Sequence, residues 1–122
     1  NLKNKVFLIS YKNNPYPFFL ISDLYIMTSL YEGCPNSIIE ATALNLPVIS
    51  SNCNSGPSEI LLNGKGGHFF KKKNFLELAS KIKLFFKNKK IFIKKMNLAK
   101  KNIFRFDEKG IIKEYINILK TI

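Results

Sequence analysis

The chain has 122 residues, of which 46% are hydrophobic and 11 are phenylalanine, and its formal net charge is +12. This length suffices for one domain with its own hydrophobic core, and the composition excludes an intrinsically disordered chain. The only two cysteines, Cys34 and Cys53, are too few for a disulfide framework and fit a reducing, cytoplasmic location.

The positive charge comes from 20 Lys and Arg against 8 Asp and Glu, and Arg105 is the only arginine. Such an excess predicts attraction to phosphates, anionic lipid or nucleic acid. Lys, Asn, Ile and Phe are all abundant, so compositional drift in an AT-rich genome is the alternative interpretation. Because nucleic-acid recognition usually uses arginine as well as lysine, we expect no specific nucleic-acid contact and favour an anionic membrane over it.

Two kinds of periodicity predict the elements in chain order. Continuous apolar runs predict four buried strands, at residues 6–10, 24–27, 47–51 and 68–70. Helical spacing predicts helices at residues 36–44, 57–62, 75–86, 92–103 and 112–119. A turn at residues 13–17 leads into one helical turn, whose aromatic side chains Tyr16, Phe18 and Phe19 are expected to pack in the core. In the first helix the predicted buried face carries Ile38, Ile39, Thr42 and Ala43.

The alternation of strands and helices predicts an α/β, Rossmann-like fold with a parallel sheet flanked by helices. The strands are apolar throughout, as burial on both faces of the sheet requires. In such sheets, ligands bind outside the carboxyl ends of the strands. Polar loops at residues 28–35 and 51–56 each follow a predicted strand and precede a helix, which predicts a ligand site there.

The first of these loops leads into a helix start that can bind phosphate. Gly33 allows close approach of the backbone, and residues 36–38 offer free N–H groups at the positive end of the helix dipole. Glu40, one turn further, can accept hydrogen bonds from both hydroxyls of a ribose, and Glu32 would lie towards the other end of a diphosphate. Two glutamates at this spacing are common, however, so the spacing alone favours exposed carboxylates that bind no ligand.

A longer stretch is more specific than the two glutamates. Residues 22–41, SDLYIMTSLYEGCPNSIIEA, resemble the E-x7-E region of the retaining GT4 family of GT-B glycosyltransferases. The resemblance continues through LPVISS at 46–51 and SGPSEIL at 55–61, and is strong between Ser22 and Gly67. It implies that residues 1–122 are a partial C-terminal nucleotide-sugar-binding domain without the N-terminal acceptor domain. Because the chain does not begin with methionine, we expect it to be a piece of a longer protein.

The resemblance also implies roles for individual residues. Glu40 is expected to bind the ribose, and Glu32 to orient the donor sugar and stabilise the transition state as the catalytic residue. The donor is expected to contact the residues between them, Gly33, Cys34, Pro35, Asn36 and Ser37. Cys34 is expected to line the pocket and not to act as a nucleophile, because no base is visible nearby. No metal or other cofactor is expected, since no His/Cys/Asp cluster has ligand spacing and the nucleotide sugar is a substrate.

The activity implied is transfer of a hexose or N-acetylhexosamine from a UDP-sugar to a glycan or lipid-linked acceptor in cell-surface polysaccharide assembly, with retention of configuration. The family's usual arginine and lysine at the diphosphate lie upstream, and no such pair precedes Val6. Alternatives are a non-catalytic sugar-nucleotide-binding remnant and a basic module that binds anionic lipid or nucleic acid. The expected location is the cytoplasm or the inner face of the cell membrane. His68 is expected to be structural.

Overall fold

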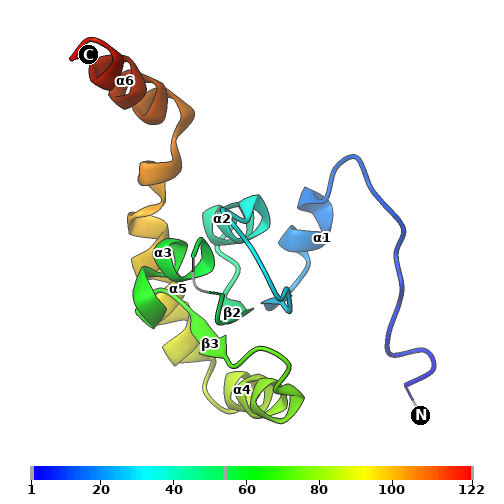
Figure 1. The fold of residues 1–122 in the computed structure, drawn as a ribbon. Coiled ribbons are helices and arrows are strands. Elements are labelled where there is room, and N and C mark those ends of the chain that lie inside the picture. Colours follow the sequence, from blue (N-terminus) through cyan, green and yellow to red (C-terminus); the bar gives the residue numbers. More distant parts are fainter. Residues whose placement is uncertain (1, 54, 122) are drawn as a thin grey trace.

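The computed structural model describes residues 2–53 and 55–121 (Figure 1). Its strands are β1 (Tyr25–Met27), β2 (Val48–Ser51) and β3 (His68–Phe70). Its α-helices are α1 (Tyr16–Leu20), α2 (Asn36–Ala43), α3 (Pro57–Ile60), α4 (Phe75–Lys87), α5 (Lys89–Lys101) and α6 (Glu108–Leu119). Two short 3₁₀ helices, η1 (Leu62–Gly64) and η2 (Ile103–Phe106), follow α3 and α5.

The three strands form one parallel sheet in the order β1-β2-β3. Ile26 pairs with Ile49, and Ile49 pairs with His68. The prediction of an α/β fold with a parallel sheet is therefore confirmed. Because the strands are parallel, the loops that follow them all begin at one edge of the sheet, which we call the carboxyl edge.

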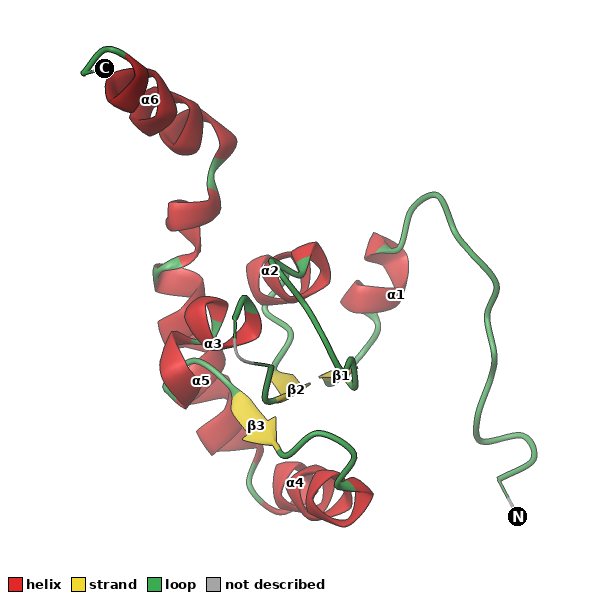
Figure 2. Ribbon diagram, in the orientation of Figure 1, coloured by secondary structure: helices red, strands yellow, loops and turns green. Residues whose placement is uncertain are grey.

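Helices cover both faces of this sheet (Figure 2). Successive side chains of β2 point to opposite faces, so Val48 and Ile49 belong to different clusters. The buried residues of the cluster beneath α2 and α3 are Met27, Ile38, Ala41, Leu46, Val48, Ile60 and Leu61. Those of the cluster beneath α4 and α5 are Ile49, Phe70, Phe85 and Phe92. All four residues of β2 are buried. Val48 and Ile49 are apolar, while the hydroxyls of Ser50 and Ser51 each donate a hydrogen bond to a main-chain oxygen, as buried polar groups require.

The predicted strand at residues 6–10 is wrong. This segment is extended but pairs with no described strand, and it runs apart from the sheet (Figure 1). Phe7 and Leu8 are 74% and 99% exposed. An apolar run predicts that a segment can be buried, but a strand also needs a neighbouring backbone to satisfy its N–H and C=O groups. No described segment of this chain supplies that neighbour.

The predicted packing of the aromatic side chains near α1 holds for one residue of three. Phe19 packs edge-on against Tyr25, with ring centroids 5.6 Å apart. Tyr16 and Phe18 remain 46% and 38% exposed, because a helix of five residues turns only one side towards the core.

The buried face of α2 also differs from the prediction. Ile38 and Thr42 are buried as expected, but the third buried residue is Ala41, and Ala43 is exposed. The helix is therefore rotated slightly from the orientation that the sequence pattern favoured.

His68 is a packed core residue, as the sequence analysis expected of a structural histidine. Its ring stacks on Phe92 with 4.0 Å between centroids, and its Nε2 is buried with no hydrogen-bond partner among the described residues. Burial, together with the nearby positive charges of Lys95 and Lys81, lowers its pKa from 6.5 to about 4. The imidazole is therefore neutral at physiological pH.

The lowered pKa of His68 makes the stability of the fold depend on pH. The imidazole of His68 binds a proton more readily in the unfolded chain than in the folded one, so acid favours unfolding. The contribution of the neutral imidazole to the free energy of unfolding is complete above pH 6.5 and is lost as the pH falls towards 4. Between pH 7.5 and pH 5 we expect the free energy of unfolding to fall by about 1 to 2 kcal/mol more in the native chain than in His68→Phe, which keeps a ring on Phe92. Urea unfolding at both pH values measures this, and equal losses in the two proteins would contradict it.

Candidate functional site

The two loops that the sequence analysis singled out are hydrogen-bonded to each other at the carboxyl edge. The Ser51 hydroxyl donates to the main-chain oxygen of Ser29 at 2.5 Å, and the Cys53 thiol donates to the same oxygen at 3.4 Å. The Ser55 hydroxyl donates to the main-chain oxygen of Glu32 at 2.6 Å. The loop after β1 therefore has its backbone fixed by side chains from the loop after β2.

Gly56 is the point at which these loops approach most closely. Its φ is +35°, and a Cβ there would lie 1.9 Å from the Gly33 oxygen and 2.7 Å from the Pro35 Cδ. A side chain at Gly56 would therefore force the loops apart. At Gly33, by contrast, a Cβ would meet nothing within 4 Å, so the opposite side of this glycine faces open space.

Helix α2 begins directly after this contact and has free donors at its start. Pro35, which precedes the helix, makes no side-chain capping bond. The Ile38 N–H donates to the Pro35 oxygen at 3.0 Å, so the prediction that Ile38 offers a free donor is wrong. The N–H groups of Asn36 and Ser37 make no hydrogen bond within residues 2–53 and 55–121. Two main-chain donors, at the positive end of an eight-residue helix, are thus available to an anion.

The two glutamates lie on either side of these donors along the chain. Glu32 is half-buried in the loop, where its main-chain oxygen is engaged, and its carboxylate has no partner among the described residues. Glu40 is half-buried one turn into α2, and the Tyr16 hydroxyl donates to its Oε1 over a long 3.5 Å.

Ser37 and Cys34, two further predicted site residues, differ in whether the fold holds their side chains in place. The Ser37 hydroxyl accepts a 2.8 Å hydrogen bond from Tyr25 of β1, which orients its side chain. The Cys34 side chain is exposed next to Gly33 and belongs to no metal-ligating group. The predicted residues from Glu32 to Glu40 therefore lie along one continuous segment around the start of α2, with the two free N–H groups at Asn36 and Ser37.

Sequence reasoning missed a cation at the same edge. Lys72 follows β3, and its Nζ lies 4.9 Å from the centroid of the ring of Tyr31, the residue that precedes Glu32 in the first loop. An open groove of about 440 Å³ here is lined by Asn52, Phe69, Phe70, Lys71, Lys72 and Glu77. Lys72 belongs to a run of three lysines, residues 71–73, and such a run usually indicates no more than a solvated surface. Since β3 runs parallel to β1, the same strand-end argument that identified the first loop would have placed Lys72 at the same edge of the sheet.

The described residues contain neither a metal-binding group nor a membrane-spanning element. Between residues 2–53 and 55–121, no three His, Cys, Asp or Glu side chains gather as ligands. No helix in those ranges is long and apolar enough to cross a bilayer.

Comparison with known proteins identifies the family to which the chain is similar. The family model for glycosyl transferases group 1 matches residues 1–104. A poly(ribitol-phosphate) alpha-N-acetylglucosaminyltransferase of Staphylococcus aureus is 28% identical over 122 residues, covering 99% of this chain and 25% of the relative. An N,N'-diacetylbacillosaminyl-diphospho-undecaprenol alpha-1,3-N-acetylgalactosaminyltransferase of Campylobacter jejuni is 30% identical over 103 residues, covering 82% of this chain and 26% of the relative. The chain thus spans about a quarter of the length of these relatives.

The fold is also similar to that of a solved protein. The crystal structure of Anabaena HepE in complex with UDP superimposes with a TM-score of 0.89 at 21% identity, over 99% of this chain and 34% of HepE. At this level of identity the similarity shows the fold, which is that of one part of a GT-B protein.

The close contact between the loops predicts opposite outcomes at two glycines. Gly56→Ala places a Cβ against the Gly33 oxygen at a strained φ, so we expect it to lower the free energy of unfolding by about 2 to 4 kcal/mol. Gly33→Ala projects into open space and serves as the matched control, with an expected change below about 1 kcal/mol. Urea unfolding of both variants checks this, and equal effects would show that the loops are not in contact.

Proposed function

The chain belongs to the glycosyl transferases group 1 family, and we propose that it forms the nucleotide-sugar-binding lobe of a retaining glycosyltransferase. The observation that carries this proposal is the pair of free N–H groups of Asn36 and Ser37, with a half-buried carboxylate, Glu40, one helical turn away. The similarity of the fold to HepE, which was solved with UDP, supports it.

The donor would bind along the start of α2. Its diphosphate accepts hydrogen bonds from the Asn36 and Ser37 N–H groups and is stabilised by the helix dipole. The ribose hydroxyls donate to the Glu40 carboxylate, whose existing bond from Tyr16 is long enough at 3.5 Å to give way. The sugar then lies beside Gly33 and Cys34, where the backbone faces open space, with Glu32 orienting its hydroxyls.

In the transfer step, the bond between the anomeric carbon and the diphosphate oxygen breaks, and its electron pair leaves with the diphosphate. The acceptor hydroxyl oxygen forms the new bond on the same face of the sugar and gives its proton to the departing diphosphate oxygen. Catalysis requires positive charge where the diphosphate develops negative charge. In this chain, the helix start and the Lys72 ammonium at the same edge would provide it, and the remaining cations would come from a preceding part of a longer protein.

For the substrates, we propose a UDP-linked hexose or N-acetylhexosamine and a glycan or lipid-linked acceptor, used in cell-surface polysaccharide assembly. The names of the relatives support this: one acts on poly(ribitol-phosphate), and the other on a sugar linked to diphospho-undecaprenol. The acceptor would be held by a further domain that faces the carboxyl edge. We place the reaction in the cytoplasm and assign no metal to it.

The proposal predicts that UDP binds this chain and that Glu40 is needed for binding. Glu40→Ala removes the acceptor of the ribose hydrogen bonds, so we expect the Kd for UDP to rise at least about tenfold. Glu59→Ala is the matched control, because Glu59 is an exposed carboxylate on α3 whose loss changes the net charge equally. Isothermal titration calorimetry measures the Kd for UDP of the native chain and of both variants.

Three results separate this proposal from its alternatives. UDP binding that depends on Glu40 but not on Glu59 supports the donor site. If that binding persists in the complete protein while no sugar is transferred, the lobe is a non-catalytic remnant. UDP binding that is absent, or unchanged in Glu40→Ala, rejects the site.

A further inference from the structure

The segment that contains α5 carries a concentration of positive charge. Ten of the chain's 20 Lys and Arg residues lie between Glu77 and Asp107, and no Asp or Glu lies between those two. Like charges crowded in this way repel each other and cost stability, unless an external anion neutralises them. An external anion that binds here would relieve this repulsion.

Half of the lysines on α5 already have partners within the chain. Lys89 forms an ion pair with Asp23 at 3.0 Å. Lys95 donates to the main-chain oxygens of Gly64 at 2.7 Å and Gly67 at 3.2 Å. Lys100 donates to Asn45 at 2.6 Å. These three side chains attach α5 to the rest of the fold and are not available to a ligand.

The other three lysines of α5 point away from the fold. Lys90, Lys94 and Lys101 are exposed, and their ammonium groups make no hydrogen bond or ion pair within residues 2–53 and 55–121. Their spacing of i, i+4 and i+11 places them along one line of the helix, opposite the buried residues Phe92 and Met96. The lysines that have no structural role are therefore the ones that share an exposed face.

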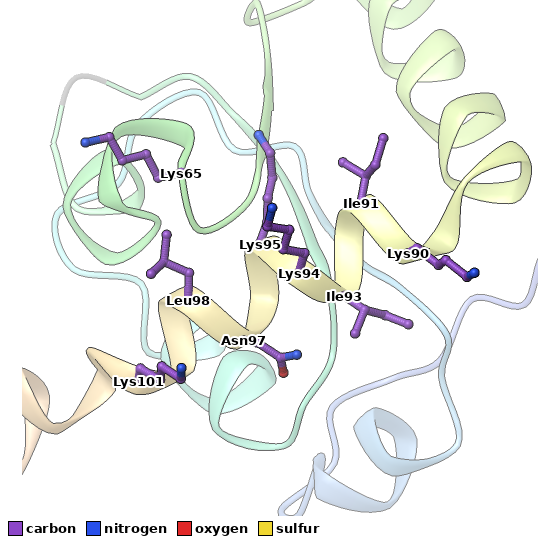
Figure 3. A pocket seen from close by; sticks show the side chains of 9 residues that line it. All are labelled: Lys65, Lys90, Ile91, Ile93, Lys94, Lys95, Asn97, Leu98 and Lys101. Atoms are coloured by element: carbon purple, nitrogen blue, oxygen red, sulfur yellow. The ribbon is translucent and has the colours of Figure 1, made fainter.

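Apolar side chains flank this line of charge. Ile91, Ile93 and Leu98 are 42%, 44% and 41% exposed. Together with the free lysines and Lys65 from the segment before β3, they border an open groove of about 780 Å³ (Figure 3). We call this surface the α5 face, and it consists of Lys65, Lys90, Ile91, Ile93, Lys94, Leu98 and Lys101.

We propose that the α5 face binds the surface of an anionic lipid bilayer. Lysines with branched aliphatic residues beside them match the two layers of such a surface, because the ammonium groups reach the headgroups while the aliphatic side chains enter the boundary with the acyl chains. α5 also packs against α2, so the bilayer would hold the start of α2 at a fixed position relative to the lipid.

Two features favour a lipid surface over nucleic acid. The α5 face contains no arginine, which provides the planar, two-pronged donors that nucleic-acid readout favours. It also contains no aromatic ring on which a base could stack, and three aliphatic side chains stand in that place. The lysines and aliphatic residues of the α5 face therefore fit a lipid surface better than a nucleic acid.

The test is co-sedimentation of the chain with vesicles at physiological salt, using phosphatidylglycerol mixed with phosphatidylcholine against phosphatidylcholine alone. We expect binding only to the anionic vesicles. The triple variant Lys90→Glu, Lys94→Glu, Lys101→Glu should weaken it at least about 100-fold, since each lysine near an anionic surface contributes about fivefold. Ile91→Ser with Leu98→Ser should weaken it about tenfold, because the charge is kept but less apolar area enters the bilayer.

The matched control is Lys12→Glu, Lys83→Glu, Lys109→Glu, which makes the same change in net charge at three exposed lysines on other segments. We expect it to weaken binding less than about tenfold. The corresponding Lys→Gln triple on α5 removes charge without reversing it, and it repeats the test if the glutamate variant does not fold. UDP binding should be the same in all these variants, so failure here and failure of the proposed function are distinguishable.

Several results would overturn the proposal. Equal losses in the α5 triple and the control triple would mean that only net charge matters. No loss in the Ile91→Ser, Leu98→Ser variant, together with competition by duplex RNA, would identify a general polyanion surface. Absence of vesicle binding at physiological salt would exclude a bilayer contact of this chain.

Discussion

The parallel pairing of β1 with β2 is the constraint on which the candidate site depends. It brings the ends of both strands to one edge, so that the polar loops after them lie side by side. Hydrogen bonds from Ser51 and Ser55 then fix the backbone of the first loop, and Gly56 permits the contact because it has no side chain. The start of α2 is held by this junction. Its two free N–H groups are therefore presented by a rigid framework, which is what an anion site requires.

Electrostatics divides the surface of the chain into two unlike regions. At the carboxyl edge, the positive end of the α2 dipole lies between two half-buried carboxylates in the sequence, and Lys72 lies over the ring of Tyr31, so groups of both signs occur there. On α5 the free charge is all of one sign and has aliphatic neighbours. The first arrangement suits a ligand that carries both phosphate and hydroxyl groups. The second suits an extended anionic surface, and the two regions are joined by the packing of α5 on α2.

Sequence patterns correctly predicted the strands and helices that pair or pack with other segments of this chain. β2 was identified from the apolar residues Val48 and Ile49 that begin it. α4 and α5 were identified because apolar residues recur in each at helical spacing. The same reasoning failed at residues 6–10, since an apolar run says nothing about which strand will pair with it. It also failed at Ile38, whose N–H turns back to Pro35 in a way that only the local backbone geometry decides.

The sequence predicted where the candidate site lies, but not the contacts that hold its loops together. The loop–helix setting of Glu32 and Glu40 can be read from the sequence, whereas the bonds of Ser51 and Ser55 and the approach of Lys72 depend on how neighbouring strand ends align. A ¹⁵N–¹H NMR titration of the chain with UDP tests whether the start of α2 is where the ligand binds. We expect the largest amide shifts at Asn36 and Ser37. Shifts confined to the lysines of α5, with none at Asn36 and Ser37, would contradict it.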